Sequence, residues 1–319
     1  MKRVLMVTVI AGLMTSGGCE KKQADPSGSD LHGTIALSGA WALYPMAVKW
    51  SEEFRKIHPG VQIDISAGGA GKGMSDCLSG GVDLGMISRP ISQAELDRDA
   101  WALAVTKDAV VVTINRKNPA IEDLLARGIT RQQCVDLWIT GTAAAWGDIA
   151  GGNHPQQVHV FTRSDACGAA ETWARYMGKK QEDLQGLGVF GDPGVAEAVK
   201  QDPLGIGFNN VNYAYDAETK KPMDSLAVLP LDINGSGTVD PEESFYEDRD
   251  TLMRAIAKGQ YPSPPARDLY LVSRGKPAKK EVVEFLRWIL TEGQAFVPEA
   301  GYVNLSEETI QDGLRRLKN

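Results

Sequence analysis

Three turns built from small residues have the composition of an anion-binding site. They are Ser38-Gly39-Ala40, Gly69-Ala70-Gly71 and Ala166-Cys167-Gly168, and each one follows a β-rich run and precedes a helical pattern. The first turn of a helix has unpaired N–H groups and a partial positive charge, and small side chains let an anion approach the backbone. Arg163 lies four residues before Cys167, and its planar guanidinium group fits a tetrahedral oxyanion. The spacing predicts one site at which the turns and Arg163 converge on an oxyanion.

Three residues near these turns have more than one chemical interpretation. Ser88 can donate to and accept from a protonated oxyanion, or it is an ordinary serine at a strand end. Trp41 either forms a wall of the ligand site or belongs to the core. Cys167 can offer its backbone N–H or act as a soft ligand, and it can also be a nucleophile with His154 or His159 as the base. An exported thiol enzyme therefore stands as the alternative to a binding protein.

Residues 232–243 have the pattern of a calcium-binding loop. The twelve residues carry oxygen-bearing side chains at positions 1, 3, 5 and 9, Gly at position 6, an apolar residue at position 8 and Glu at position 12, as an EF-hand loop does. The run Leu226–Leu231 before the loop is strand-like, so a helix–loop–helix sensor is not expected. The alternative is a surface turn rich in Asp, Asn and Gly. The predicted Ca²⁺ ligands are Asp232, Asn234, Ser236, Thr238 through its carbonyl, Asp240 and Glu243.

An α/β fold with layered elements is needed to position these residues. From Gly33 onward, short β-rich runs alternate with amphipathic helical patterns. Met46, Trp50, Phe54 and Ile57 recur at the spacing of one helix face and predict a buried stripe. Further helices are expected around residues 170–177 and 282–290. The expected strands are 34–37, 61–66, 83–87, 110–114, 158–162 and 269–273.

The composition limits the domain count and the class of partner. The chain has 319 residues, which is too long for one ordinary core and fits two domains. Its formal net charge of −7 argues against nucleic acid as a partner, because phosphate backbones need a clustered basic face. Of the four cysteines, Cys77, Cys134 and Cys167 lie in the folded part. In an oxidising compartment this odd number leaves at least one thiol unpaired in a monomer, and the sequence leaves the pairing open.

The N-terminal segment reads as an export signal and not as part of the fold. Lys2-Arg3 precedes the apolar run Val4–Met14, whose 11 residues are too few to span a bilayer. Small residues, Ser16-Gly17-Gly18, stand directly before Cys19, which resembles a bacterial lipoprotein signal with Cys19 as the lipidated residue. A plain secretory signal is the alternative. We expect an exported, membrane-anchored protein in the periplasm or at the cell surface, with Glu20–His32 as a flexible tether.

The order of segments resembles the periplasmic phosphate-binding proteins of ABC transporters. The likeness extends from about Gly33 to Leu317. The resemblance implies a type 2 periplasmic-binding-protein architecture, in which two α/β lobes are joined by a hinge and enclose an interlobe ligand cleft. On that pattern residues 33–113 and 265–319 form lobe 1, and residues 114–264 form lobe 2. The segments that carry the resemblance include Asp83–Pro90, Asn115–Pro119, Trp146–Asp148, Arg163–Ala169 and Glu292–Tyr302.

The resemblance also implies ligand positions, at several of which this sequence departs from the family. Side-chain hydroxyl groups that the family has in the first turn, in the Gly-rich turn and after the arginine are mostly absent here, whereas the backbone donors remain. The implied function is the capture of an inorganic oxyanion for an ABC transporter permease, without catalysis. Phosphate is the favoured ligand, and sulfate, molybdate and arsenate are the alternatives. The implied ligand positions are Ala40, Trp41, Ala42, Ala70, Gly71, Ser88, Arg163, Cys167, Gly168 and Ala169.

Overall fold

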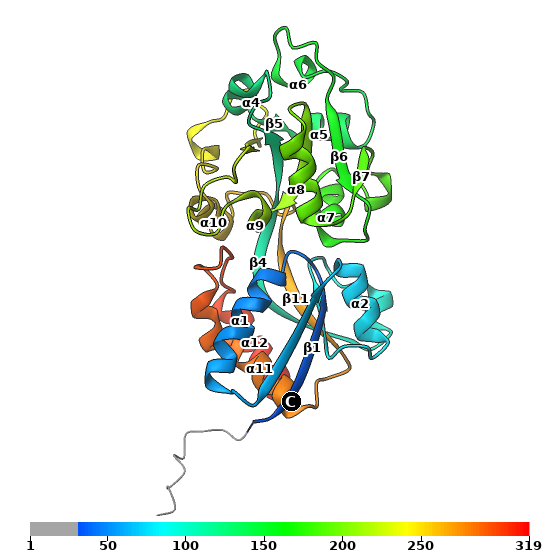
Figure 1. The fold of residues 1–319 in the computed structure, drawn as a ribbon, viewed down its shortest axis with the longest axis vertical. Helices are drawn as coiled ribbons and strands as arrows, with labels where there is room; N and C mark the ends of the chain where they lie inside the picture. The colour runs from blue at the N-terminus through cyan, green and yellow to red at the C-terminus, as the bar shows by residue number, and fades with distance from the viewer. Residues whose placement is uncertain (1–30, 319) are drawn as a thin grey trace, which may run out of the picture.

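Two α/β lobes, joined by two long antiparallel strands, make up the computed structural model, which describes residues 31–318 (Figure 1). The joining strands are β4 (Ala100–Asn115) and β11 (Ala266–Arg274), and both run from one lobe into the other. The predicted signal segment, the lipidation site Cys19 and most of the tether lie outside the described residues. The expected two-lobed α/β architecture is confirmed.

Lobe 1 is built around the N-terminal parallel strands. Its part of the sheet has the order β2-β1-β3-β11-β4, in which β11 runs antiparallel both to β3 and to β4. The strands are β1 (Gly33–Gly39), β2 (Val61–Ala67) and β3 (Leu84–Ile87). The helices are α1 (Tyr44–Ile57), α2 (Ala70–Leu78), α3 (Gln93–Leu96), α11 (Lys280–Leu290), η3 (Glu292–Phe296) and α12 (Glu307–Lys318).

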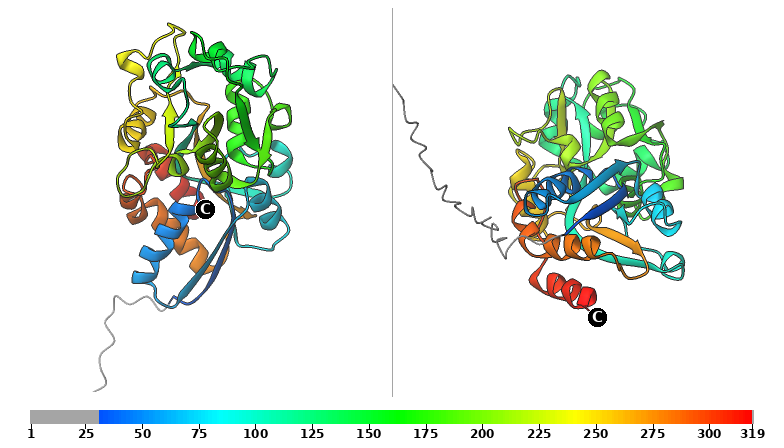
Figure 2. Two further views of the ribbon diagram at one scale, coloured as in Figure 1. Left: turned by 45° about the horizontal axis from the view of Figure 1, so that its top comes forward. Right: turned by 60° about the horizontal axis from the view of Figure 1, so that its bottom comes forward.

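Three of the four residues predicted as the apolar stripe of α1, Met46, Trp50 and Phe54, pack into lobe 1, whereas Ile57 at the end of the helix is 55% exposed and the prediction for it was wrong. Pro45 stands in the first turn of α1, where a missing N–H costs no hydrogen bond. Trp50 and Phe54 are fully buried, and the ring of Phe54 lies 5.1 Å from that of Phe285 in α11. This packing joins the two ends of the chain in one lobe, as the two further views in Figure 2 also show.

Lobe 2 contains the remaining strands of the same sheet and a separate sheet of two parallel strands, β5 and β10. β8 and β9 pair antiparallel with β4, and β6 lies parallel to β8 and β7. The strands are β5 (Ile129–Thr130), β6 (His159–Arg163), β7 (Leu187–Val189), β8 (Gly205–Asn210), β9 (Leu226–Leu229) and β10 (Leu231–Asp232). The helices are α4 (Ile121–Arg127), α5 (Arg131–Trp138), α6 (Gly147–Ala150), α7 (Gly168–Tyr176), η1 (Gln181–Asp183), α8 (Gly191–Gln201), α9 (Val211–Ala214), η2 (Pro241–Glu243) and α10 (Arg249–Ala257).

The two lobes have separate apolar cores that divide within β4. Leu103 and Val105 belong to the core of lobe 1, whereas Ala109 and the following residues of β4 belong to that of lobe 2. Between them lie the buried polar residues Thr106 and Asp108. The crossing segment therefore carries a buried carboxylate between two apolar cores.

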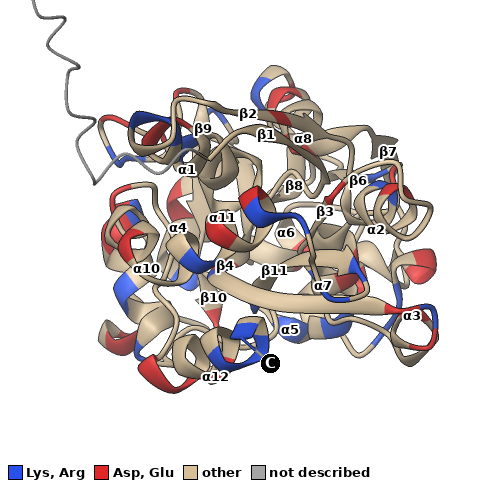
Figure 3. Cartoon of the chain, turned by 90° about the horizontal axis from the view of Figure 1, so that it is seen from below, with Lys and Arg blue, Asp and Glu red and all other residues tan. Residues whose placement is uncertain are grey.

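The distribution of charged residues on the surface agrees with the acidic net charge of the sequence (Figure 3). Basic and acidic residues are interspersed around the periphery seen in Figure 3, so that view shows no continuous basic face of the kind that nucleic acid requires. Among residues 31–318, none of the helices combines the length and the apolar character that crossing a membrane demands.

Candidate oxyanion-binding site

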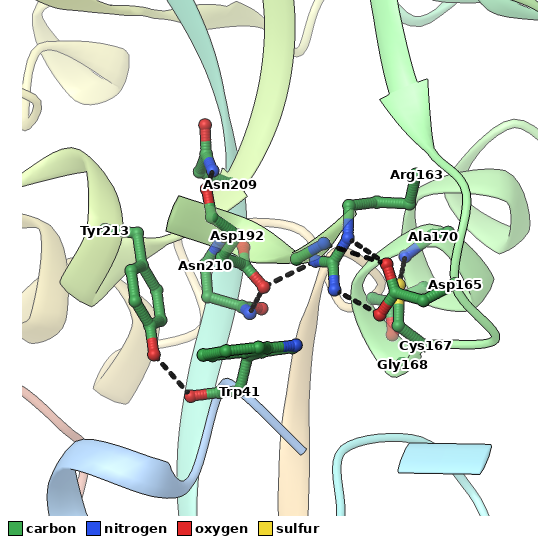
Figure 4. Close-up of polar contacts among 12 residues, drawn as sticks. Trp41, Arg163, Asp165, Cys167, Gly168, Ala170, Asp192, Asn209, Asn210 and Tyr213 are labelled. Carbon is green, nitrogen blue, oxygen red and sulfur yellow. Dashed lines mark hydrogen bonds and ion pairs between the residues drawn. The ribbon is translucent and has the colours of Figure 1, made fainter. Parts of the chain in front are cut away.

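The guanidinium group of Arg163 lies in the interior, at the end of β6, and has two carboxylate partners (Figure 4). Its Nε and one terminal nitrogen donate to the two oxygens of Asp165 over 2.8 and 2.6 Å. The other terminal nitrogen donates to Oδ2 of Asp192, in the first turn of α8. These contacts use three of the five N–H donors of the guanidinium group and leave two for a ligand.

The charge of Arg163 is held firmly in place by these neighbours. Burial acts to lower the pKa of Arg163, but the negative charge of Asp192, together with Cys167 and Asp165, outweighs burial and raises that pKa. Asp165 also accepts the N–H of Gly191, and Asp192 accepts the N–H of Asn210. Arg163 is therefore a fixed, permanently charged donor and not a mobile surface side chain.

The N-terminus of α7 provides two free backbone donors beside Arg163. Cys167 is the residue before the helix, and its sulfur accepts the N–H of Ala170 at 3.5 Å. The N–H of Cys167 donates to Oε1 of Gln181 and is thus occupied. Among the described residues, the N–H groups of Gly168 and Ala169 have no acceptor. An anion in front of α7 would receive these two donors.

The first two turns offer the same kind of donor from lobe 1. Trp41 and Ala42 precede α1, and Ala70 begins α2. Within residues 31–318, none of their three N–H groups has a hydrogen-bond acceptor. The N–H of Gly71, by contrast, donates to the carbonyl oxygen of Ala166 in lobe 2 at 3.0 Å. Gly71 thus links the lobes instead of offering a free donor.

The turns of the two lobes approach one another closely. A Cβ atom added to Gly168 would lie 2.2 Å from Oγ and 2.3 Å from the carbonyl oxygen of Ser88, which is buried after β3. A Cβ atom on Gly69 would lie 3.0 Å from Oδ2 of Asp165 and 3.6 Å from Cβ of Cys167. Ser88 and the Gly-rich turn of lobe 1 therefore face the start of α7 in a closed arrangement.

Trp41 lies at the boundary between the lobes and not within one core. Its ring meets those of Phe190 and Tyr213 edge to face, with ring centres 6.3 and 6.5 Å apart. The hydroxyl group of Tyr213 donates to the carbonyl oxygen of Trp41 at 3.1 Å. The indole nitrogen is buried and has no partner among the described residues. Figure 4 shows the ring below Asp192 and Asn210, so Trp41 walls the site.

A cavity of about 340 Å³ adjoins the site between the lobes. Gly71 and Cys167 contribute to its lining. The ion pair of Arg89 with Glu95 also lines it, as does Glu171 in the first turn of α7. The cavity has a mainly polar lining in which carboxylates outnumber cations.

A buried polar network behind Arg163 was not predicted from the sequence. Asn210 donates through Nδ2 to Asp192, and its Oδ1 accepts from Arg267. Arg267, on β11, is paired with Asp108 on β4 and donates to the carbonyl oxygen of Gly168 at 2.5 Å. These residues are far apart in the sequence and form no local motif, so only the pairing of β4, β8 and β11 brings them together.

Cys167 lacks the surroundings of a nucleophile. Burial raises the pKa of its thiol to about 12, so the thiolate is disfavoured at neutral pH. His154 is hydrogen-bonded to Asp123 and His159 to Asp202, and neither histidine is hydrogen-bonded to Cys167. The three cysteines in the described part of the chain, Cys77, Cys134 and Cys167, are all buried and unpaired.

The predicted calcium loop is a compact turn in lobe 2. Asp232 and Glu243 are buried, and Asp232 accepts the N–H of Gly237, the glycine at position 6, whose φ is +81°. Asn234 and Ser236 both donate to Oδ2 of Asp240. Across residues 31–318, no cluster of three His, Cys, Asp or Glu side chains has the arrangement of a metal site, since these carboxylates accept N–H and O–H groups.

Comparisons with known proteins support the fold and the family. The chain is 27% identical to the "Phosphate-binding protein PstS" of Methanocaldococcus jannaschii, over 98% of this chain and 92% of that protein. It is 24% identical to the protein of the same name from Staphylococcus haemolyticus, over 98% of this chain and 95% of that protein.

Solved structures give the same architecture. A putative phosphate ABC transporter substrate-binding protein with bound phosphate from Clostridium perfringens has a TM-score of 0.70 and 20% identity, over 86% of this chain and 100% of that chain. An ABC-type phosphate transport receptor from Vibrio cholerae has a TM-score of 0.62 and 19% identity, over 85% of this chain and 100% of that chain. The model of the family described as "PBP superfamily domain" matches residues 24–292, most of the chain, and the chain therefore belongs to this superfamily.

Proposed function

We propose that this protein captures inorganic phosphate for an ABC transporter. The observation that carries the proposal is the meeting of three helix-start turns with the buried Arg163 between two closed lobes. The relatives named phosphate-binding protein PstS and the phosphate receptors of the same fold support this ligand class.

Backbone donors would hold most of the anion. The free N–H groups of Trp41, Ala42 and Ala70 come from lobe 1, and those of Gly168 and Ala169 come from lobe 2. Charge-assisted hydrogen bonds of this kind are short and strong, and helix starts add a partial positive charge. Because donors come from both lobes, binding of the anion would stabilise the closed arrangement.

Arg163 would supply the charged contact. Asp165 and Asp192 fix its orientation, so the two remaining N–H groups are aimed without a further loss of rotamer freedom. Ser88 adds a hydroxyl group that can either donate or accept. A binding role also fits Cys167 better than catalysis does, because its thiol is buried and has a raised pKa, and because the hydrogen bonds of His154 and His159 go to Asp123 and Asp202 instead.

Other oxyanions remain the competing ligands within the same proposal. Alanine occupies positions 40, 42, 70 and 169, so the site relies on backbone N–H groups, which recognise sulfate, molybdate and arsenate as well as phosphate. Thermal unfolding against a panel of these four anions tests the choice. At a hundredfold excess over Kd, phosphate should add about 2.7 kcal/mol of stability. A larger shift with another anion would reassign the ligand.

The export and metal expectations complete the proposal. A lipidated Cys19 would hold the protein at a membrane, where a permease partner accepts the captured anion. One structural Ca²⁺ would be bound by the six predicted oxygen ligands of residues 232–243. The twelve-residue pattern supports this site, and so does the burial of Asp232 and Glu243, which form no ion pair with a residue in the range 31–318. Detection of a Cys19-linked lipid by mass spectrometry and of bound calcium by elemental analysis would test the two points.

A further inference from the structure

The indole ring of Trp41 reaches from lobe 1 into lobe 2. It packs against Gly191, at which an added Cβ atom would lie 3.3 Å from both Cε2 and Cζ2 of the indole. The rings of Phe190 and Tyr213, which also belong to lobe 2, meet the indole edge to face. Three residues of the opposite lobe therefore hold this ring, so its position depends on the closed arrangement of the lobes.

The nitrogen edge of this ring is directed toward the anion-binding turn of lobe 2. Cε2 is bonded to Nε1, and this edge lies against Gly191, whose N–H donates to Oδ1 of Asp165. In Figure 4 the nitrogen end of the indole points away from Tyr213 and toward the side on which Arg163 and Cys167 lie. The indole nitrogen is thus on the ligand side of the ring.

This nitrogen is a buried donor without an acceptor. Nε1 of Trp41 is buried and has no hydrogen-bond partner among residues 31–318. An indole N–H can donate a hydrogen bond but cannot accept one. A buried donor that is left unpaired destabilises the folded protein, so an acceptor from outside the chain would relieve this cost.

The other unpaired indoles lie in different surroundings. Within the described residues, Nε1 of Trp146, Trp173 and Trp288 is also buried without a partner. Trp146 and Trp173 belong to the core of lobe 2, and Trp288 belongs to the core of lobe 1. Each of these three rings is thus part of a single core, whereas Trp41 lies between the lobes. A ligand that enters between the lobes can therefore reach the nitrogen of Trp41 and not those of the other three.

The ligand turns around Trp41 provide few donors from side chains. Alanine occupies positions 40, 42, 70 and 169, so at these positions the turns contribute backbone groups only. Arg163 reaches the site from lobe 2, and from lobe 1 the Ser88 hydroxyl lies close to the start of α7. An N–H group that donates to an anionic oxygen forms a charge-assisted hydrogen bond, which is shorter and stronger than a neutral one. The indole N–H would add one such bond from lobe 1.

From this placement we infer that the indole N–H of Trp41 is a direct ligand of the oxyanion, donated from lobe 1 when the lobes close. The inference rests on the proposed function and adds a side-chain contact to that site. Trp41 then has two roles, as a wall of the site and as a hydrogen-bond donor to one oxygen of the anion. Because lobe 2 holds the ring in place, the contact also couples binding to closure.

Nuclear magnetic resonance of the indole groups tests the contact directly. The chain has seven tryptophans, and the indole resonance of Trp41 in the isotope-labelled full chain is identified by its loss in Trp41→Phe. Saturation with inorganic phosphate should move the indole proton of Trp41 downfield, because it gains an anionic acceptor. The indole protons of Trp50 and Trp138 should move less, since they already donate to the carbonyl oxygens of Gly293 and Phe161.

Removal of the N–H at constant shape measures its contribution. A benzothiophene ring, introduced site-specifically in place of the Trp41 indole, has sulfur where the indole has its N–H and keeps nearly the same shape. The affinity for phosphate, measured by calorimetry, should fall about tenfold or more, because a hydrogen bond to a charged group is lost. The melting temperature of the ligand-free protein should stay the same or rise, because a buried unpaired donor has been removed. A ring with a purely structural role would change stability and not affinity.

The same replacement at Trp101 is the matched control. Trp101 lies at the start of β4, where its ring contacts the guanidinium group of Arg316 within lobe 1. The Trp101 variant should bind phosphate as the parent does.

Three results would overturn the inference. An indole resonance of Trp41 that stays in place while phosphate binds would show that the N–H gains no acceptor. A shifted resonance together with parent-like affinity in the benzothiophene variant of Trp41 would assign the shift to closure of the lobes alone. Equal losses of affinity in the Trp41 and Trp101 variants would assign the effect to the replacement itself. In these three cases the parent still binds phosphate, whereas absence of binding by the parent would overturn the proposed function and this inference with it.

Discussion

At the scale of single residues, the site depends on Arg163, whose guanidinium group pairs with two carboxylates. The sequence predicted Arg163 from its distance to Cys167, and the structure adds Asp165 and Asp192 as its partners. Asp165 stands two residues after Arg163 and could have been anticipated, whereas Asp192 is 29 residues away and follows an unremarkable turn. A close partner in the chain can be predicted from spacing, but a distant one needs the fold.

Removal of the arginine should weaken both binding and folding. In Arg163→Ala the buried carboxylates of Asp165 and Asp192 lose their counterion, which costs about 3–5 kcal/mol of stability. The lost charge-assisted hydrogen bonds should reduce the affinity for phosphate about 10- to 150-fold. Arg163→Lys should restore only part of the stability and only part of the phosphate affinity. The reason is that the point charge of lysine cannot form the planar, two-point contacts of a guanidinium group. Denaturant unfolding and calorimetry measure the two effects, and parent-like binding in Arg163→Ala would refute the placement of the site.

Replacement of the cysteine should be harmless. The sulfur of Cys167 accepts the N–H of Ala170 at the start of α7, a position that serine fills more favourably. Cys167→Ser should therefore bind phosphate as tightly as the parent or more tightly, with an equal or higher melting temperature. Loss of binding in this variant would instead support the thiol chemistry that the sequence left open.

At the scale of elements, the turns and not the helices themselves determine how closely the lobes meet. The expected strands at 34–37, 61–66, 83–87, 158–162 and 269–273 correspond to β1, β2, β3, β6 and β11, because apolar periodicity marks them clearly. The expected strand 110–114 is only the end of the 16-residue β4. The middle of β4 contains Thr106, Lys107 and Asp108, whose polar side chains interrupt the apolar pattern between the two cores.

A methyl group at the start of α7 should hinder closure. In Gly168→Ala the added Cβ would lie 2.2–2.3 Å from two oxygens of Ser88, one of them in the backbone. The lobes must then stay apart, and we expect the affinity for phosphate to fall at least tenfold, while each lobe stays folded. Gly188→Ala, where the nearest atom would lie 3.3 Å away, is the control in the same lobe. Equal affinities of the two variants would contradict the closed arrangement of these turns.

Calcium should stabilise the loop 232–243 if the loop binds it. Chelation should lower the free energy of unfolding by about 2.7 kcal/mol when the ion had been present at a hundred times its Kd. Glu243→Gln keeps acceptors for the N–H groups of Ile233 and Asn234 but removes the charge, so it should abolish the response. The neighbouring Glu242→Gln should respond to chelation as the parent does. An identical melting temperature with and without chelator in the parent would defeat the calcium proposal.

At the scale of the whole molecule, the polar network connects the ligand site to the hinge. Arg267 and Asp108 lie on the two strands that join the lobes, and Arg267 also holds the start of α7 through the carbonyl oxygen of Gly168. The two-lobed fold was predictable from the order of segments, but this connection was not, since it depends on strand register. A change at the site is therefore linked through packed, buried contacts to the two strands that join the lobes.

One hydrogen bond between the lobes should contribute to affinity. The hydroxyl group of Tyr213 in lobe 2 donates to the carbonyl oxygen of Trp41 in lobe 1, whereas that of Tyr302 donates to Ala42 within lobe 1. Tyr213→Phe should weaken phosphate binding about two- to tenfold, because one hydrogen bond of about 0.5–1.5 kcal/mol is lost only in the closed state. Tyr302→Phe should lower stability and leave affinity unchanged. Calorimetry on both variants decides, and equal effects on affinity would contradict the assignment of the two contacts.

The central claim is that this chain is a receptor for a tetrahedral oxyanion, with phosphate as its ligand. Direct calorimetric titration of the purified protein with inorganic phosphate near pH 6.5 tests it most simply. We predict saturable binding of one phosphate per chain with a Kd of about 1 µM or tighter, equivalent to about 8 kcal/mol or more. Absence of saturable binding at millimolar phosphate would contradict the account.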